Sequence, residues 1–167
     1  MMHQEFLQQL TVWALLLVPE GIIMIFTGLG FLGVFPPKKL CILVGLFFGT
    51  ATCALRAILP GGLHVVASLL TYIVLVHFIL KISIKTAMLA CFVSSFLVNI
   101  GQLIVALPIL KLTGLTFDQT LSTPWLHVAF GWAGDTVLGI IAIYTIIKRK
   151  PFIPVPESDM QGGAGQE

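Results

Sequence analysis

Five long apolar stretches dominate the sequence and leave little room for any fold other than a membrane bundle. They lie at residues 10–34, 40–59, 64–80, 86–110 and 125–147. Each is close to the roughly 20 residues that a helix needs to cross the ~30 Å hydrocarbon core of a bilayer. Short segments rich in Pro, Gly and Lys separate most of them. The pattern predicts an all-α, polytopic membrane protein, a bundle of about five transmembrane helices.

The composition agrees with lipid rather than water as the solvent. Hydrophobic residues make up 57% of the chain and charged residues 10%, with a mean hydropathy of +1.04, whereas soluble domains average roughly 25% charged residues. The net charge of +2 is too small to indicate a nucleic-acid partner. We expect one transmembrane domain over residues 1–150. The Pro-, Gly- and acid-rich residues 151–167 are expected to form a disordered cytoplasmic tail.

The basic residues predict an orientation for the bundle. Seven of the nine fall on one side of the predicted helices: Lys38, Lys39, Lys81, Lys85, Lys148, Arg149 and Lys150. The other side carries Arg56 and Lys111. Because Lys and Arg are enriched in cytoplasmic loops, we expect the N-terminus outside and the C-terminus in the cytoplasm of a multi-pass plasma-membrane protein.

Three ionisable residues lie within or at the edge of the predicted hydrocarbon region, namely Glu20, Arg56 and Asp135. A charge at the bilayer centre costs about 2.5–3.5 kcal/mol even on the lenient insertion scale. Each should therefore face the bundle interior, a partner group or water. These residues are the strongest candidates for ligand binding or for an internal ion pair.

Stripes of small and polar residues extend this candidate site. Gly131, Asp135 and Gly139 share one face of the last helix. Three other helices carry similar stripes: Gly45, Gly49, Cys53 and Arg56; His64, Ser68 and Thr71 or Tyr72; and Cys91, Ser95, Asn99 and Gln102. They predict an interior polar site in the outer half, formed by Glu20, Arg56, Asp135, His64, Asn99 and Gln102. The alternative for Asn99 and Gln102 is hydrogen bonding that merely holds helices together.

Two prolines interrupt the apolar stretches. Pro19 directly precedes Glu20 and is expected to kink the first helix, because proline frees the carbonyl four residues earlier. Pro108 is expected simply to end the fourth helix.

Motifs of common enzyme classes are absent from the sequence. Gly28, Gly30 and Gly33 form a GxGxxG string, but no strand precedes it and no acidic residue follows at the required distance, so helix packing is the better interpretation. A membrane cysteine protease has one weak candidate pair, Cys41 and His77. The cysteines show no CxxC spacing. We expect a non-enzymatic protein with no cofactor and no metal site.

Short motifs resemble those of a known family. They are Pro19-Glu20, Gly28-Leu29-Gly30 with Gly33, Arg56 with Leu59-Pro60 and Gly62 to His64, and Ser122 to Trp125. Over most of residues 10–147 they resemble the multi-pass N-terminal membrane region of Firmicute sensor histidine kinases of the Spo-zero-B or accessory-gene-regulator sensor type. The matching positions are Pro19, Glu20, Arg56, Pro60 and His64. The resemblance implies a bacterial membrane region that senses an external or membrane-borne signal and passes it to a cytoplasmic helix pair carrying a phosphorylated histidine.

The sequence after Lys150 departs from that family. It contains no dimerisation helix, phosphoacceptor histidine or ATP-binding domain, so we expect no kinase activity from it. The leading hypothesis is a stand-alone membrane sensor or regulator that acts through a partner protein, either a kinase or an ATPase. One rival is a substrate-binding membrane subunit of a small-molecule transporter, and the other is a membrane scaffold or assembly protein. An oligomer is compatible with all three.

Overall fold

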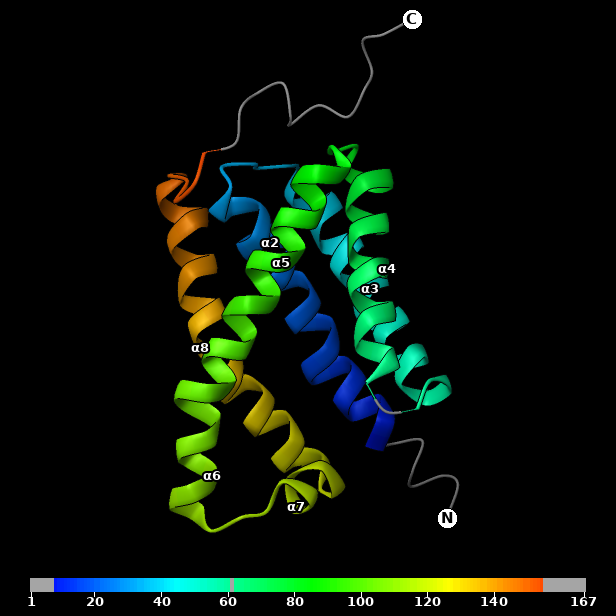
Figure 1. Cartoon of the computed structure of the whole chain (residues 1–167), viewed down its shortest axis with the longest axis vertical. Helices are drawn as coiled ribbons and strands as arrows, with labels where there is room; N and C mark the ends of the chain where they lie inside the picture. The colour runs from blue at the N-terminus through cyan, green and yellow to red at the C-terminus, as the bar shows by residue number, and fades with distance from the viewer. Residues whose placement is uncertain (1–7, 61, 155–167) are drawn as a thin grey trace, which may run out of the picture.

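The computed structural model describes residues 8–60 and 62–154, which form a helical bundle with no strand among them (Figure 1). A helix that begins at Gln8 leads into the first named element. The elements are η1 (Trp13–Leu17), α2 (Val18–Phe31), α3 (Lys38–Ile58), α4 (Leu63–Leu80), α5 (Ile84–Gly101), η2 (Gln102–Ala106), α6 (Leu107–Thr113), α7 (Phe117–Ser122) and α8 (Pro124–Lys148). The two η elements are π-helical turns inside longer helices.

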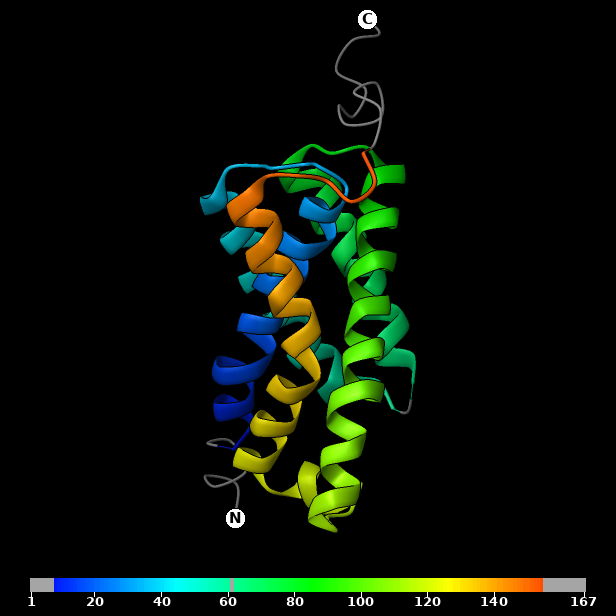
Figure 2. The same cartoon turned by 90° about the vertical axis from the view of Figure 1, so that its left-hand side faces the viewer.

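Five helices are long and apolar enough to cross a membrane, as the sequence predicted. They are Gln8–Phe31, Lys38–Ile58, Leu63–Leu80, Ile84–Thr113 and Pro124–Lys148. The fourth is longer than expected, because Pro108 does not end it. The wider π turn η2 precedes this proline and the helix continues as α6, so that α5, η2 and α6 form one rod (Figure 2).

The bundle has two chemically different ends. At one, here called the lysine end, lie the C-termini of α2, α4 and α8 and the N-termini of α3 and α5, with all seven of the clustered basic residues. At the other, here called the α7 end, lie Gln8, α6, α7 and the C-terminal turn of α3, which carries Arg56. The clustered basic residues therefore do gather at one end of the bundle.

Helix α2 occupies the centre and packs against α3, α5 and α8. Glycines bring these backbones together. A Cβ on Gly28 would lie 2.5 Å from the carbonyl oxygen of Ala90 in α5, and one on Gly30 would lie 2.8 Å from the hydroxyl of Thr145 in α8. Gly45 of α3 lies against the backbone of Ile22 in the same way. The GxGxxG string therefore serves helix packing at two of its three glycines.

The tightly packed apolar core lies in the half of the bundle nearer the lysine end. Its buried side chains come mainly from the second half of α2, the first half of α3, the second half of α4 and the first half of α5, together with Leu138 of α8. Tyr72 is fully buried there, donates its hydroxyl to the carbonyl of Met24 at 3.4 Å, and packs edge-on against Phe48. The α7 half of the bundle lies outside this core.

The first residues after α8 fold back onto the lysine end. The ring of Phe152 stacks on Phe31 with the ring centroids 4.8 Å apart, and the backbone N–H groups of Phe152 and Ile153 donate to the Phe31 carbonyl. Pro151 lies beside Gly33. Most of the segment predicted to be a disordered tail, residues 155–167, lies outside the described residues.

The contact between α5 and α8 yields a stability prediction. A Cβ on Gly101 would collide with the carbonyl oxygen of Gly134, and nothing lies within 4 Å of one on Gly139. Gly101→Ala should lower the free energy of unfolding by about 1–3 kcal/mol, because overpacked helices must separate. The matched variant Gly139→Ala should be neutral or slightly stabilising, because Ala favours helix. Thermal unfolding of the purified variants measures both, and equal effects would contradict the contact.

Candidate functional site

A cavity of about 530 Å³ opens in the α7 half of the bundle. Its wall draws on every one of the five long helices and on α7. Five of the six sequence-predicted site residues line it: Glu20, Arg56, His64, Gln102 and Asp135. Residues more than 100 positions apart in the chain thus meet around one space, as the stripes of small and polar residues predicted.

Two carboxyl groups mark the interior wall of this cavity. Asp135 of α8 is 3% exposed, and its Oδ1 atom has no hydrogen-bond partner among the described residues. Glu20 of α2 is half-buried and lies close enough to Asp135 for the two carboxylates to repel each other. Burying an acceptor without a donor costs free energy, and a second negative charge adds to that cost. The Asp135 carboxyl group therefore lacks a hydrogen-bond donor that would offset the cost of its burial.

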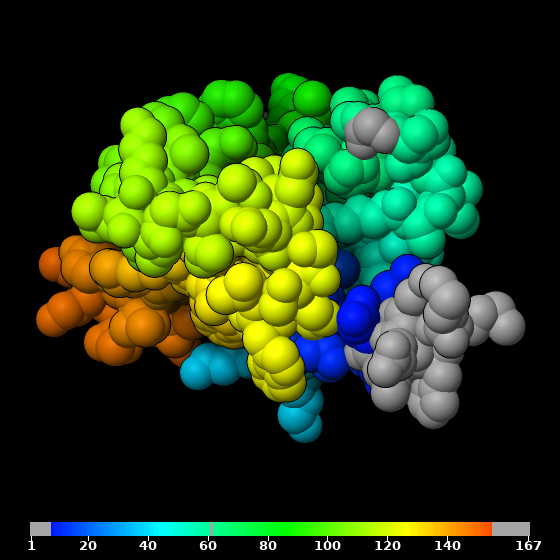
Figure 3. Space-filling view, turned by 90° about the horizontal axis from the view of Figure 1, so that it is seen from below, coloured from blue at the N-terminus to red at the C-terminus, as the bar shows by residue number. Residues whose placement is uncertain are grey.

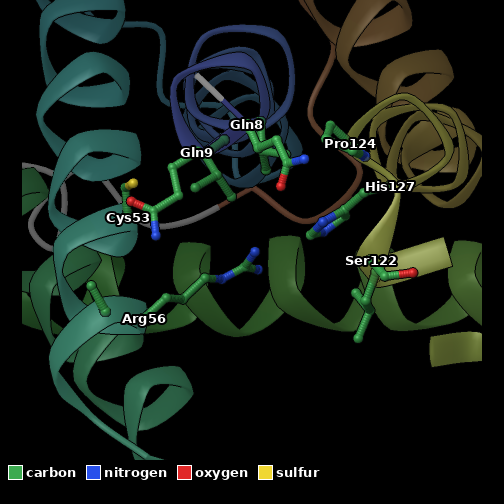
Figure 4. Close-up of a pocket in the computed structure, with 11 residues that line it drawn as sticks. Gln8, Gln9, Cys53, Arg56, Ser122, Pro124 and His127 are labelled. Carbon is green, nitrogen blue, oxygen red and sulfur yellow. The ribbon is translucent and has the colours of Figure 1, made fainter. Parts of the chain in front are cut away.

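Arg56 stands where this cavity adjoins a second one. The second cavity measures about 350 Å³, and both are lined by Arg56, Leu121 and His127. Figure 4 shows the Arg56 guanidinium and the His127 ring projecting into the second cavity from opposite walls. Arg56 also interacts electrostatically with Glu20. The Arg56 side chain thus lies between the second cavity, which Gln8 also lines, and the larger cavity, which contains the two carboxyl groups.

Helix α7 lines both cavities and lies between the apolar stretches 86–110 and 125–147, where the sequence predicts no transmembrane helix. Its start is fixed by a capping box: Gln119 N–H donates to the Thr116 hydroxyl, and Thr116 N–H donates to the Gln119 side chain. The Thr-x-x-Gln spacing was the available signal. Phe117, Thr120 and Leu121 line the larger cavity. Viewed onto this end, α7 lies centrally over the bundle (Figure 3).

Both π turns border the same cavity. Leu16 of η1 and Gln102 of η2 line it. Each rests on a glycine of α8, because a Cβ on Gly131 would collide with Leu16 and one on Gly134 would collide with Gln102. Single π turns inside α-helices occur often at functional sites. At these turns the side chains of Leu16 and Gln102 pack against α8, the helix that carries Asp135.

Pro19 explains the irregularity of the first helix. Proline has no N–H to donate to the carbonyl four residues earlier, which is that of Leu15. This carbonyl accepts instead the indole N–H of Trp132 in α8, at 2.8 Å. The kink predicted at Pro19 is thus a widened turn, and the released backbone acceptor ties the first helix to α8 one turn from Asp135.

Asn99 is the one predicted site residue that the structure does not bring to the cavity. It is exposed, and its amide donates to the Ser95 carbonyl at 2.7 Å within its own helix. At about 100° per residue, Asn99 lies roughly 80° around the helix from Cys91, but Gln102 only about 20°. The predicted stripe was therefore too wide, and Asn99 falls outside its edge.

The described residues offer no arrangement typical of metal or cysteine chemistry. No group of three His, Cys, Asp or Glu side chains among them could share a metal ion. His77 bonds through Nδ1 to the Ile82 carbonyl at 2.7 Å, and Cys41 faces the Pro36 carbonyl at 3.9 Å. The two residues suggested for a protease thus have separate partners.

Comparison of the chain with protein-family models, curated proteins and solved structures gave no match. The site must therefore be interpreted from its own geometry.

The unpartnered carboxyl group predicts a stability gain on its removal. Asp135→Asn keeps the side-chain shape and removes a carboxyl group whose ionised form is costly to bury, so the unliganded protein should unfold about 2–4 °C higher, equivalent to about 1 kcal/mol. Asp118→Asn removes an exposed carboxyl from the first turn of α7 and serves as the control, which should not raise the midpoint. Differential scanning fluorimetry provides the measurement. A clear fall for Asp135→Asn would mean that this carboxyl group has a structural partner.

Proposed function

We propose that this chain is a non-enzymatic, multi-pass membrane sensor or regulator whose α7-half cavity binds a small molecule. The observation that carries the proposal is the cavity of about 530 Å³ in which Glu20, Arg56 and Asp135 converge. Charged side chains inside an apolar bundle are costly and are mostly retained for ligand, ion or proton handling. The resemblance of the Pro19-Glu20 and Arg56 motifs to sensor-kinase membrane regions supports the same function.

The orientation belongs to this proposal. The seven clustered basic residues at the lysine end favour a cytoplasmic location for that end of a bacterial plasma-membrane protein. The α7 end then faces outward, and the cavities open toward the external medium. A ligand from outside would reach the carboxyl groups past Arg56, and a partner protein would contact the lysine end.

The two π turns support the proposed transfer of a signal from the cavity. They interrupt the first and fourth long helices beside the cavity, where small shifts of one helix past another are easiest. The lysine half is closely packed around Gly28 and Gly30, so it would follow such a shift as a unit. A partner kinase or another regulatory protein would receive the change there.

A second candidate function rests on the paired cavities. Two adjoining compartments that share Arg56, Leu121 and His127 also suit the capture step of a small-molecule transporter, with an ATPase on another chain. The two functions differ in what is lost on mutation. A sensor changes gene expression with uptake intact, whereas a transporter subunit loses uptake and copurifies with the ATPase.

Chromosomal variants test the sensor function without knowledge of the ligand. Glu20→Gln and Asp135→Asn should each alter the expression of a defined gene set to the same degree as deletion of the gene, because both remove a charge from the cavity. Transcript sequencing gives the readout, and membrane abundance is checked by immunoblot. Asp118→Asn, outside both cavities, should behave as wild type.

Two contrary outcomes are informative. Loss of uptake of a metabolite in the two cavity variants would favour the transporter subunit. Wild-type transcription and uptake in both, at normal abundance, would remove the case for a ligand site.

Labelling with a membrane-impermeant maleimide tests the orientation. In a background with Cys41, Cys53 and Cys91 changed to Ala, Ser122→Cys at the exposed α7 end should be labelled in intact cells. Lys150→Cys should react only after permeabilisation. Labelling of Lys150→Cys in intact cells would reverse the proposed topology.

A further inference from the structure

We propose that the ligand of this cavity is a small organic cation, whose protonated amine is held between Glu20 and Asp135. The inference rests on the proposed function, since it names the chemical class that the ligand-binding cavity accepts. It is carried by a cavity with two neighbouring carboxyl groups, one of which is buried and lacks a donor.

The charges around the cavity are unbalanced. Among the residues that line it, Glu20 and Asp135 are acidic, and Arg56 is basic besides the two histidines His64 and His127. When both carboxyl groups are ionised, two negative charges and one positive charge leave one negative charge uncompensated. A ligand with a single positive charge neutralises the set, whereas an anion doubles the imbalance.

Hydrogen bonding points to the same class. Oδ1 of Asp135 is buried and unpartnered among the described residues, and Asp135 is one of the residues that line the cavity. An ionised carboxylate accepts hydrogen bonds and cannot donate them, so the missing group must be a donor. An ammonium group supplies up to three donors and can bridge two carboxylates, and its hydrogen bonds to them are charge-assisted.

The size and the apolar wall distinguish an amine from a metal ion. A space of about 530 Å³ is far larger than a bare cation needs, and no three-residue metal group occurs among the described residues. Leu16, Phe117 and Phe130 line the same cavity. They suit an apolar or aromatic portion of the ligand, and an aromatic face also attracts the cation itself.

Three matched probes test the inference on the full chain in lipid nanodiscs at pH 7. They are 2-phenylethylamine, 2-phenylethanol and 3-phenylpropanoate, which carry a positive, neutral and negative end on similar skeletons. Isothermal titration calorimetry against empty nanodiscs corrects for partition into lipid. We expect the amine to bind at least about tenfold more tightly than the other two, because only it forms charge-assisted bonds to both carboxylates.

Variants locate the binding site. Asp135→Asn and Glu20→Gln should each weaken amine binding at least about tenfold, and Asn99→Ala, which alters an exposed polar residue outside the cavity, should leave it unchanged. The thermal midpoint of each unliganded variant establishes that it is folded.

Three results would overturn the inference: no binding by any probe, amine binding no tighter than that of the alcohol, or tightest binding by the carboxylate. If the carboxylate binds best and Arg56→Gln abolishes this, the cavity is an anion site, and the proposed sensor function stands without the amine. The transcription test with chromosomal variants judges that function separately.

Discussion

Close backbone contact around α2 is the constraint on which the rest of the structure depends. Helices in an apolar solvent gain little from burying apolar surface, so they associate through van der Waals packing at small residues. Gly28 and Gly30 admit α5 and α8 near the lysine end, and Gly49 of α3 meets the Leu17 carbonyl nearer the α7 end. Helix α3 therefore packs against the first long helix in both halves of the bundle. The contacts at Gly28 and Gly30 hold α5 and α8 in the lysine half.

The cavity lies in the half of the bundle away from the apolar core. In the lysine half, α2, α5 and α8 meet around buried side chains such as Ile25 and Leu138. In the α7 half, α2 presents Glu20 and α8 presents Asp135 to a common space. A longer apolar side chain at either position could fill part of that space and remove a costly charge. The carboxyl groups therefore work against stability, which is typical of positions retained for function.

The sequence was a good guide wherever a single strong energetic term decides the structure. Apolar length predicted the five long helices, and the cost of charges in lipid singled out Glu20, Arg56 and Asp135, which line one cavity. It failed where several weak terms compete. Placing Asn99 correctly required an accurate angle of rotation around the helix axis between it and the other residues of the predicted stripe. The helix α7 depends on a capping box of only two hydrogen bonds, and residues such as Phe117 joined the site only through it.

Proline chemistry links the cavity to the architecture in a way that apolar patterning could not reveal. Pro19 and Pro108 each follow a π turn, and both turns border the space that contains the carboxyl groups. The Leu15 carbonyl, which Pro19 cannot bond, is bonded by Trp132. Under the proposed function, a ligand that draws Glu20 and Asp135 together acts on the two helices that this bond joins, at the turns where their geometry is least regular. The glycine-packed lysine half is then the rigid body through which the shift reaches the opposite end.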